Sequence, residues 1–292
     1  MPTLYVIATP IGNLSDLSPR ALETLHHVSL VAAEDTRVTG ALLHKFGIEK
    51  PLISCHRHNE SGRLQEILGR MAREGIDVAL TTDAGTPAIS DPGNLLVKEA
   101  AAAGMDVVAI PGCCAVAAAL SVSGFSAGAF AFYGFLPRER GSLRKKLDDI
   151  SRGIPVCVVY ESPHRVTALV QTLAEKYPDC SVCCCCDLTK LFEKVIRGSA
   201  KEVAAHLADD PKTEKGEYCL VFDFSTQAMP QEQPEPAQEQ SLMLRLVALM
   251  LDGATAQQAI AKLSEQGVRK NDLKRAALAL KKWITATAEA GQ

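Results

Sequence analysis

Three clusters of polar residues each follow an apolar stretch of the chain: EDTR at 34–37, HRHN at 56–59 and YESPHR at 160–165. Their carboxylates and imidazoles are groups that can take up or return a proton during a reaction. A single cluster of this kind is more typical of a solvated loop that caps a helix. Three of them, each directly after a predicted strand, favour an active site.

Three turns in the first 120 residues are rich in small or rigid residues: TPIGN at 9–13, DAGTP at 83–87 and PGCC at 111–114. Parallel α/β sheets bind ligands at the carboxyl ends of their strands, where such turns lie. The chain contains no G-x-G and no G-x-x-x-x-G-K-[ST] motif, so a phosphate cradle is poorly supported. The turns instead predict a ligand held by backbone amides, with Asp83 and Asp91 as the available carboxylates.

The elements that must position these residues alternate between strands and helices. Amphipathic stretches near 19–27, 61–74 and 94–103 separate the apolar runs TLYVIA, SLVAAE, DVALTT and DVVAI. This alternation predicts an α/β fold with parallel βα units. Ser18-Pro19 has the residue types of an N-cap and a first helical position. We assign residues 1–120 to an N-terminal α/β domain that carries the ligand-binding turns.

A second α/β domain is predicted over residues 121–224. The runs PVCVVY, SVCCCC, EKVIRG and EYCLVFDF alternate there with helices at about 163–176 and 199–208. Residues 225–240 consist largely of proline, glutamine and glutamate, as in a flexible linker. Residues 241–292 form a small helical module, in which Thr255-x-x-Gln258 is a capping box.

The charged residues are unevenly distributed. The chain of 292 residues has a net charge of only −3, so any nucleic-acid site must be a local patch. Segment 137–146, PRERGSLRKK, is such a patch, and it follows the aromatic residues of segment 130–135. Aromatic and basic residues together suit unstacked RNA, although these aromatics could equally be core. Residues 241–292 hold eight Lys or Arg against four Asp or Glu, hence +4.

The helical module shows an amphipathic pattern near its end. Apolar positions of its last helix can face inward while lysines line another face, which is equally typical of a solvated helix. The apolar positions are Leu273, Ala277, Leu280 and Ile284, and the lysines are Lys270, Lys274 and Lys281.

The ten cysteines do not indicate a disulfide scaffold in a chain of this size, and reduced thiols are expected. On a strand the consecutive residues 183–186 would point to alternate faces, so they could not converge on one metal ion, and no metal is predicted. Residues 107–137 are uncharged, but Pro111-Gly112, Gly124 and Gly128 interrupt them, so a membrane span is not expected. The first basic residue is Arg20, which does not fit a secretory signal, and a cytoplasmic location is expected.

Eight ordered motifs resemble a known family. They are YVIATPIGNLSDLSPRAL, AAEDTR, CHRHNE, TDAGTPAISDPG, AIPGCCA, FYGFLPR, YESPHR and LTKLFE, which together span residues 3–224. This order is similar to the ribosomal RNA small subunit methyltransferase I group of the tetrapyrrole methylase superfamily. The resemblance implies two α/β domains with S-adenosylmethionine in the cleft between them, and a homodimer.

The resemblance also implies the substrate and the contacts. The substrate would be a cytidine in the decoding centre of 16S rRNA in the 30S subunit, methylated on its ribose 2'-oxygen. The residues that correspond to cofactor contacts are Pro10, Asp83, Pro87, Ile89, Cys113, Cys114, Tyr160 and Gly216. Two motifs depart from the family: PGCCA replaces PGPSA, and CDLTK at 186–190 replaces RELTK. The first change removes a serine hydroxyl, and the second removes a guanidinium and shortens an acid.

A ribose hydroxyl needs a base or a hydrogen-bond acceptor near its oxygen, and several residues could serve. The catalytic candidates are Asp35, Glu161, His164 and Lys190, with Glu34 and His58 also open. The candidate RNA contacts are Arg37, His58, Arg138, Arg140, Arg144, Lys145 and Lys146. Two alternatives remain: a methylase that acts on a small tetrapyrrole-type molecule, and a ribosome assembly factor that does no chemistry.

Overall fold

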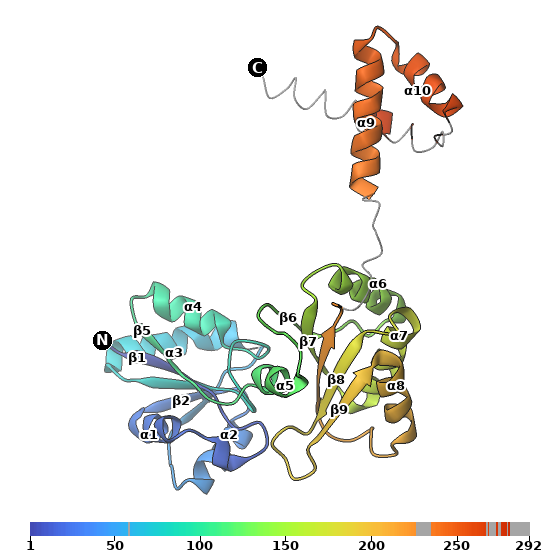
Figure 1. Cartoon of the computed structure of the whole chain (residues 1–292). Helices are drawn as coiled ribbons and strands as arrows, with labels where there is room; N and C mark the ends of the chain where they lie inside the picture. The colour runs from blue at the N-terminus through green and yellow to red at the C-terminus, as the bar shows by residue number, and fades with distance from the viewer. Residues whose placement is uncertain are drawn as a thin grey trace. The chain divides into compact units, whose positions relative to one another are not determined.

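The computed structural model describes residues 1–57, 59–225, 235–266, 268, 273, 276–278 and 280. The chain divides into two compact units, Met1–Gln227 and Ala228–Gln292. The first unit contains two five-stranded sheets with helices on both faces of each, and the second is helical (Figure 1). No helix within the described ranges combines the length and the apolar character needed to cross a lipid bilayer.

The first sheet is entirely parallel, with the strand order β3-β2-β4-β1-β5. Its strands are β1 (Thr3–Ile7), β2 (Leu30–Ala33), β3 (Leu52–Ser54), β4 (Val78–Thr81) and β5 (Asp106–Ile110). Helices α1 (Pro19–His27) and α2 (Thr36–Lys45) pack on one face, and α3 (Glu60–Glu74) and α4 (Asn94–Ala102) on the other (Figure 1). The predicted βα alternation is therefore confirmed, and β3 is the strand expected before the polar cluster at 56–59.

The helix ends of this sheet follow the local sequence. The Ser18 side chain accepts a hydrogen bond from the Ala21 amide, with Pro19 in the first turn of α1. Helix α3 ends at Gly75, which has a φ of +66° and is therefore in the left-handed region that glycine tolerates best. These ends return the chain to the amino edge of the sheet, so all the polar turns gather at the opposite edge.

The second sheet is mixed, with the order β6-β7-β10-β8-β9, and only β6 and β7 are parallel. Its strands are β6 (Ala131–Phe135), β7 (Val156–Glu161), β8 (Ser181–Cys186), β9 (Lys194–Ser199) and β10 (Tyr218–Asp223). Helices α6 (Arg140–Ser151), α7 (Pro163–Lys176) and α8 (Ala200–Asp209) cover one face, and α5 (Ala115–Ser123) covers the other. Helix α5 spans residue 120, the proposed end of the first domain.

The cysteine-rich strand β8 lies in the middle of this core. Cys184 and Cys186 pack beneath the three helices, whereas Cys183 and Cys185 pack toward α5, as the alternation of a strand requires. All ten cysteines are free thiols. The described residues contain no group of three or more potential ligands placed to hold a metal ion.

The C-terminal unit contains α9 (Glu235–Leu251) and α10 (Ala256–Glu265). The Thr255 capping box at the start of α10 is confirmed by both of its reciprocal hydrogen bonds. Leu273 and Leu280 are buried in the core of this unit, while Ile284 and the three lysines of the predicted basic face lie outside the described residues. Helix α9 begins at Glu235, within the predicted linker 225–240. Pro236 is compatible with this start, because the amides of a first helical turn have no partner within the helix.

Candidate functional site

The structure brings the three turns of the first domain together. The backbones of Thr9 and Gly85 exchange two hydrogen bonds, of 2.9 and 3.0 Å, and the Thr86 hydroxyl donates to the Cys113 carbonyl oxygen at 3.0 Å. Gly85 has a φ of +86°, which lets the backbone turn back toward Thr9. A small cavity of about 30 Å³ lies beside these turns, and its lining includes Ile89 and Cys114.

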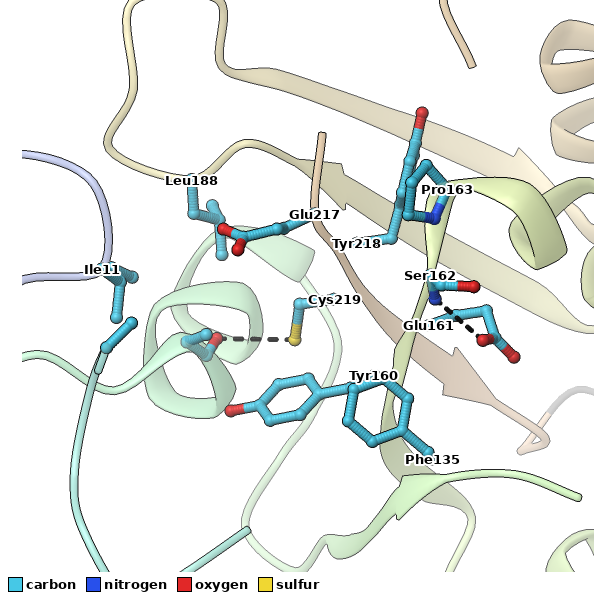
Figure 2. A pocket seen from close by; sticks show the side chains of 12 residues that line it. Ile11, Phe135, Tyr160, Glu161, Ser162, Pro163, Leu188, Glu217, Tyr218 and Cys219 are labelled. Carbon is cyan, nitrogen blue, oxygen red and sulfur yellow. Dashed lines mark hydrogen bonds between the residues drawn. The ribbon is translucent and has the colours of Figure 1, made fainter. Parts of the chain in front are cut away.

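A second cavity, of about 340 Å³, lies between the two sheets (Figure 2). It is called the large cavity below, in contrast to the small cavity of about 30 Å³. Ile11 and Ala84 line it from the first domain, and Ala115 lines it from α5. The second sheet contributes most of the remaining wall, in which apolar side chains predominate. Those residues are Phe135, Tyr160, Glu161, Ser162, Pro163, Leu188, Glu217, Tyr218 and Cys219.

Strand pairing explains why β10 contributes to this wall. Antiparallel β7 and β10 place Tyr218 opposite Glu161 and Cys219 opposite Tyr160. The Cys219 thiol donates to the Ala115 carbonyl oxygen at 3.6 Å, which joins the wall to α5 (Figure 2). Cys219, Glu217 and Leu188 were not among the predicted site residues, because the register that brings them to the cavity is a long-range pairing.

Glu161 is the carboxylate buried in this cavity wall. Its side chain has no exposed surface, and its Oε1 accepts a hydrogen bond of 2.8 Å from the Ser162 amide. The other oxygen, Oε2, lies 3.1 Å from Arg165 Nη2 but has no hydrogen-bond partner among the described residues. Burial raises the pKa of Glu161 above its ordinary value, opposed by the Ser162 amide and by the charge of Arg165. Of the predicted catalytic residues, Glu161 alone combines a raised pKa with a place in this wall.

Two further cavities, of about 500 and 380 Å³, adjoin Glu161 and are lined by arginines. Arg138, Glu161 and Arg165 line both of them, and His164 lines the smaller one. Arg165 Nη2 donates to the carbonyl oxygens of Leu136 and Pro137, at 2.9 and 3.2 Å. Glu161 therefore separates an apolar cavity from a cationic surface.

Asp35 and Arg37 form an exposed ion pair at the start of α2. Asp35 Oδ1 accepts hydrogen bonds from the amide and from Nε of Arg37, at 2.8 and 3.0 Å. The Arg37 guanidinium lowers the pKa of Asp35 to about 2. A general base works best when its pKa lies near the working pH, so Asp35 is better suited to capping α2 than to taking a proton.

Lys190 is held by two carboxylates. Its ammonium lies 2.8 Å from Asp187 Oδ1 and 2.7 Å from Glu217 Oε2. Partial burial by itself would lower the pKa of Lys190, but the two hydrogen bonds outweigh it and raise the pKa above its ordinary value. Lys190 is thus a permanent cation, which suits positioning better than proton abstraction. Gly216 has a φ of +89°, and a Cβ there would come within 2.5 Å of Asp187 Oδ2.

An acidic cluster lies beside the turn at 83–87. Glu34 Oε2 accepts hydrogen bonds from the Thr82 hydroxyl at 2.5 Å and from the Asp83 amide at 3.3 Å. Asp83 Oδ1 in turn accepts from the Asp35 amide at 3.0 Å. Burial raises the pKa of Asp83 and of Asp91 above their ordinary values, and neighbouring carboxylates add to the effect.

Seven of the eight residues aligned with cofactor contacts fall into two groups, and the eighth, Asp83, belongs to the acidic cluster described above. Tyr160 lines the large and the small cavity, and Ile89 and Cys114 line the small one. Pro10 and Pro87 are buried beneath the turns, and the Cys113 thiol donates to the Asp16 carbonyl oxygen at 3.5 Å. This second group, which also includes Gly216, shapes the loops around the cavities.

The predicted RNA contacts differ in how far they are already engaged. Arg140 and Arg144 both pair with Glu175, and the Lys146 ammonium lies 4.7 Å from the centre of the Tyr133 ring. Arg138 and Lys145 are exposed and have no hydrogen bond or ion pair within the described part of the chain. His58 lies outside the described residues.

Comparison with known proteins places the chain in a family. The model for Tetrapyrrole (Corrin/Porphyrin) Methylases matches residues 3–204. Proteins named "Ribosomal RNA small subunit methyltransferase I" are similar along most of their length. The protein from Synechocystis is 41% identical, covering 91% of this chain and 93% of its own. Those from Pseudomonas aeruginosa (41% identical, 94% and 96% covered) and Bacillus subtilis (37%, 90% and 89%) are similar too.

A solved structure shares the fold. It is that of a uroporphyrin-III C-methyl transferase from Thermus thermophilus complexed with S-adenyl homocysteine. The TM-score is 0.53 at 18% identity, with 76% of this chain and 97% of the other covered. At that identity the likeness speaks for the fold alone. The length and identity of the sequence matches are decisive: this chain belongs to the tetrapyrrole methylase family, with the proteins named ribosomal RNA small subunit methyltransferase I.

Proposed function

We propose that this chain transfers a methyl group from S-adenosylmethionine to the ribose 2'-oxygen of a cytidine in the decoding centre of 16S rRNA. We further propose that it acts on the 30S subunit in the cytoplasm, as a homodimer. Relatives named for ribosomal RNA methylation, which match nearly the whole chain, support the reaction class. One observation carries the proposal: the buried Glu161 carboxylate lies between an apolar cavity and an arginine-lined surface.

The residues around the large cavity fit S-adenosylmethionine. A volume of about 340 Å³ falls in the range of small-molecule sites, and apolar walls suit an adenine ring and the aliphatic carbons of the methionine chain. Thr189, the neighbour of the cavity-lining Leu188, has a buried Oγ1 without a hydrogen-bond partner among the described residues. Asp83 and Asp91 are available to a cationic or hydroxyl group. The proposed cofactor contacts remain Pro10, Asp83, Pro87, Ile89, Cys113, Cys114, Tyr160 and Gly216.

The chain's own part in the reaction is to align two partners and to move one proton. When bound, S-adenosylmethionine would supply a methyl group activated by a positively charged sulfur. The apolar walls exclude water and hold the reacting atoms in line. Glu161 Oε2 accepts the proton of the 2'-hydroxyl, so that no positive charge builds up on the 2'-oxygen as it is methylated. Arg165, 3.1 Å away, opposes the effect of burial on the Glu161 pKa and so favours the ionised form.

The test is methyl transfer to a natural substrate. The protein is incubated with labelled S-adenosylmethionine and undermethylated 30S subunits, and the label is mapped by nuclease digestion. We expect label in a 2'-O-methylcytidine. Label only in an added tetrapyrrole would instead identify a small-molecule methylase. Cofactor binding and subunit binding without transfer would identify an assembly factor.

A further inference from the structure

Phe135 is an apolar residue that the fold exposes at the mouth of the large cavity. This residue, at the end of β6, is 61% exposed, whereas Tyr218 and Cys219 of the same cavity wall are buried. An aromatic ring left open to water loses the free energy that its burial would contribute. A ring in that position suggests a partner that is absent from the isolated chain.

A bulge in the strand directs Phe135 toward the cavity. Phe132 pairs with Val158, so a regular ladder would place Gly134 opposite Tyr160, but Phe135 takes that place. The extra residue is accommodated at Gly134, which has a φ of +60°. Bulges of this kind redirect a side chain and are common beside active sites. The bulge brings Phe135 to the face of the sheet that carries Tyr160.

The ring of Phe135 is supported along one side. Its centroid lies 5.9 Å from that of Tyr160, in an edge arrangement with 63° between the planes (Figure 2). Tyr160 is in turn packed against Phe132, with a centroid distance of 4.9 Å. The three rings form a row of edge contacts in which only the outermost ring, Phe135, is largely exposed.

Cationic groups lie next to the exposed ring. Phe135 lines both the large apolar cavity and the cavity of about 500 Å³ that contains Arg138 and Arg165. Arg138 is exposed and unpaired within the described ranges, whereas Arg165 is engaged by backbone carbonyls. Glu161 lines both cavities too. An aromatic face, an available guanidinium and a buried carboxylate therefore surround one space.

These three groups match the three parts of one unstacked nucleotide. Bases of single-stranded RNA stack on aromatic side chains, phosphates bind arginine, and a ribose hydroxyl can donate to a carboxylate. A second copy of this chain or an apolar peptide could cover Phe135, but neither would account for the buried carboxylate beside it. The charge on Arg138 also favours a polyanion.

We propose that Phe135 is the stacking platform for the base of the acceptor nucleotide, which enters the site unstacked from its RNA neighbours. This inference rests on the proposed function and adds a positioning residue to it. Stacking on Phe135, with a phosphate on Arg138, holds the ribose so that its 2'-oxygen faces Glu161. Enzymes that act on a base within a duplex extrude it into a pocket, and an unstacked acceptor nucleotide would be held here in a similar way.

The test compares three substitutions in the full-length protein with undermethylated 30S subunits. Phe135→Leu keeps the apolar character but removes the ring, Phe135→Trp keeps a ring, and Phe130→Leu removes an exposed ring (44% exposed) that precedes the same strand. From the usual contribution of base stacking, Phe135→Leu should lower kcat/KM for the subunit roughly 5- to 100-fold, mainly through KM. Phe135→Trp and Phe130→Leu should stay within about twofold of the parent.

Calorimetry of S-adenosylmethionine binding separates this role from that of a simple cavity wall. We expect the cofactor affinity of Phe135→Leu to be close to that of the parent. If the loss lies entirely in cofactor affinity and disappears at saturating cofactor, the platform is overturned. It is overturned equally if Phe135→Leu keeps the parental kcat/KM, or if Phe135→Trp is as impaired as Phe135→Leu.

A second measurement does not depend on methyl transfer. A short single-stranded RNA with a 2-aminopurine ribonucleotide should lose fluorescence on binding the parent and Phe135→Trp, because stacking quenches the probe, but not on binding Phe135→Leu. If the parent transfers no methyl group to subunits yet quenches the probe, the proposed function fails and the platform stands. If transfer occurs without any difference in quenching, the platform fails and the proposed function stands.

Discussion

At the scale of single residues, similar polar groups have different properties because their surroundings differ. Glu161 and Asp35 both follow buried strands, but one is enclosed in a cavity wall and the other is exposed beside Arg37. Enclosure raises the pKa of Glu161, whereas the exposed ion pair lowers the pKa of Asp35 to about 2. The two carboxylates, equivalent in the sequence, are thus suited to different tasks.

Replacement of Glu161 tests the proton acceptor. Glu161→Gln keeps the size of the side chain, and we expect kcat to fall by ~10²- to 10⁴-fold while the Kd for S-adenosylmethionine changes little. Asp35→Ala, the control, should stay within about threefold of the parent in kcat and lose only the stability that its helix cap contributes. The measurement is single-turnover methyl transfer with saturating cofactor and subunits. Equal rates for Glu161→Gln and the parent would exclude Glu161 as the base.

The pH dependence of Glu161 has a definite sign. Its raised pKa means that the ionised form is less stable in the folded chain than in the unfolded chain, so this residue costs stability as the pH rises through its folded pKa. The base must be ionised to act, so activity should rise over the same range. Glu161→Gln should therefore lose activity without losing stability at pH 8, as measured by urea unfolding. A large drop in its unfolding midpoint at pH 8 would indicate a structural role instead.

Asp83 offers a separate test of the cofactor site. Asp83→Asn keeps an oxygen that can accept the hydrogen bond from the Asp35 amide but removes the negative charge. If the carboxylate contacts the cofactor, its loss should weaken S-adenosylmethionine binding roughly 10- to 100-fold, the usual effect of a charged hydrogen bond. Calorimetric titration measures this directly. A parental Kd in a folded Asp83→Asn protein would remove Asp83 from the site.

At the scale of elements, loops and helix ends decide which charged groups are available. The start of α6 carries the basic segment, but Glu175 of α7 already engages Arg140 and Arg144. Arg138 and Lys145 are left exposed and unpaired among the described residues. A count of basic residues in the sequence therefore overstates the charge that this segment can offer to phosphates.

The salt dependence of RNA binding should reflect this difference. Each phosphate contact contributes roughly 0.7–0.9 to the slope of log K against log salt. We expect Arg138→Gln with Lys145→Gln to reduce the slope by about 1.5, and Arg140→Gln with Arg144→Gln to reduce it by less. Filter binding of 30S subunits at several salt concentrations measures both pairs. Equal slopes in all three proteins would show that this segment is a solvated surface.

Gly216 lies just before β10 and close to Asp187, which belongs to the loop after β8. Gly216→Ala forces a Cβ to within 2.5 Å of Asp187 Oδ2, whereas Gly104→Ala has a similar positive φ but open space around it. Both should lose about 1–2 kcal/mol through the left-handed backbone. Only Gly216→Ala should additionally disturb the Asp187–Lys190–Glu217 cluster and weaken cofactor binding. Urea unfolding and calorimetry measure stability and cofactor affinity in both variants. Equal cofactor affinities in Gly216→Ala and Gly104→Ala would contradict this prediction.

At the scale of the whole molecule, the chain has two units with separate cores. The first unit, Met1–Gln227, contains both sheets and every described cavity residue of the proposed site. The second unit, Ala228–Gln292, buries its own apolar cluster and carries the basic excess of residues 241–292. Cofactor binding and RNA binding should therefore depend on these units to different degrees.

Removal of the second unit tests that division. A chain ending at Gln227 should bind S-adenosylmethionine with the parental Kd, because the cavity is complete within the first unit. It should bind 30S subunits more weakly and with a smaller salt slope, because the eight basic residues of segment 241–292 are lost. Calorimetry and filter binding measure the two effects. An unchanged subunit affinity would leave the second unit without a part in RNA binding.

Local patterns in the sequence determined much of the fold. The strand runs, the Ser18 and Thr255 caps and the alternating burial of residues 183–186 follow from interactions between near neighbours. The three turns were recognisable because glycine frees the backbone and proline restricts it wherever they occur. The ordered motifs were enough to indicate the family.

Only the tertiary structure decided which polar residues form the site. The mixed order of the second sheet brings Cys219 beside Tyr160, and a one-residue bulge turns Phe135 toward the cavity. Neither the pairing partner nor the register of a strand can be read from the strand alone, because both depend on contacts far apart in the chain. The pKa difference between Glu161 and Asp35 has the same origin, since burial and neighbouring charge are properties of the folded chain.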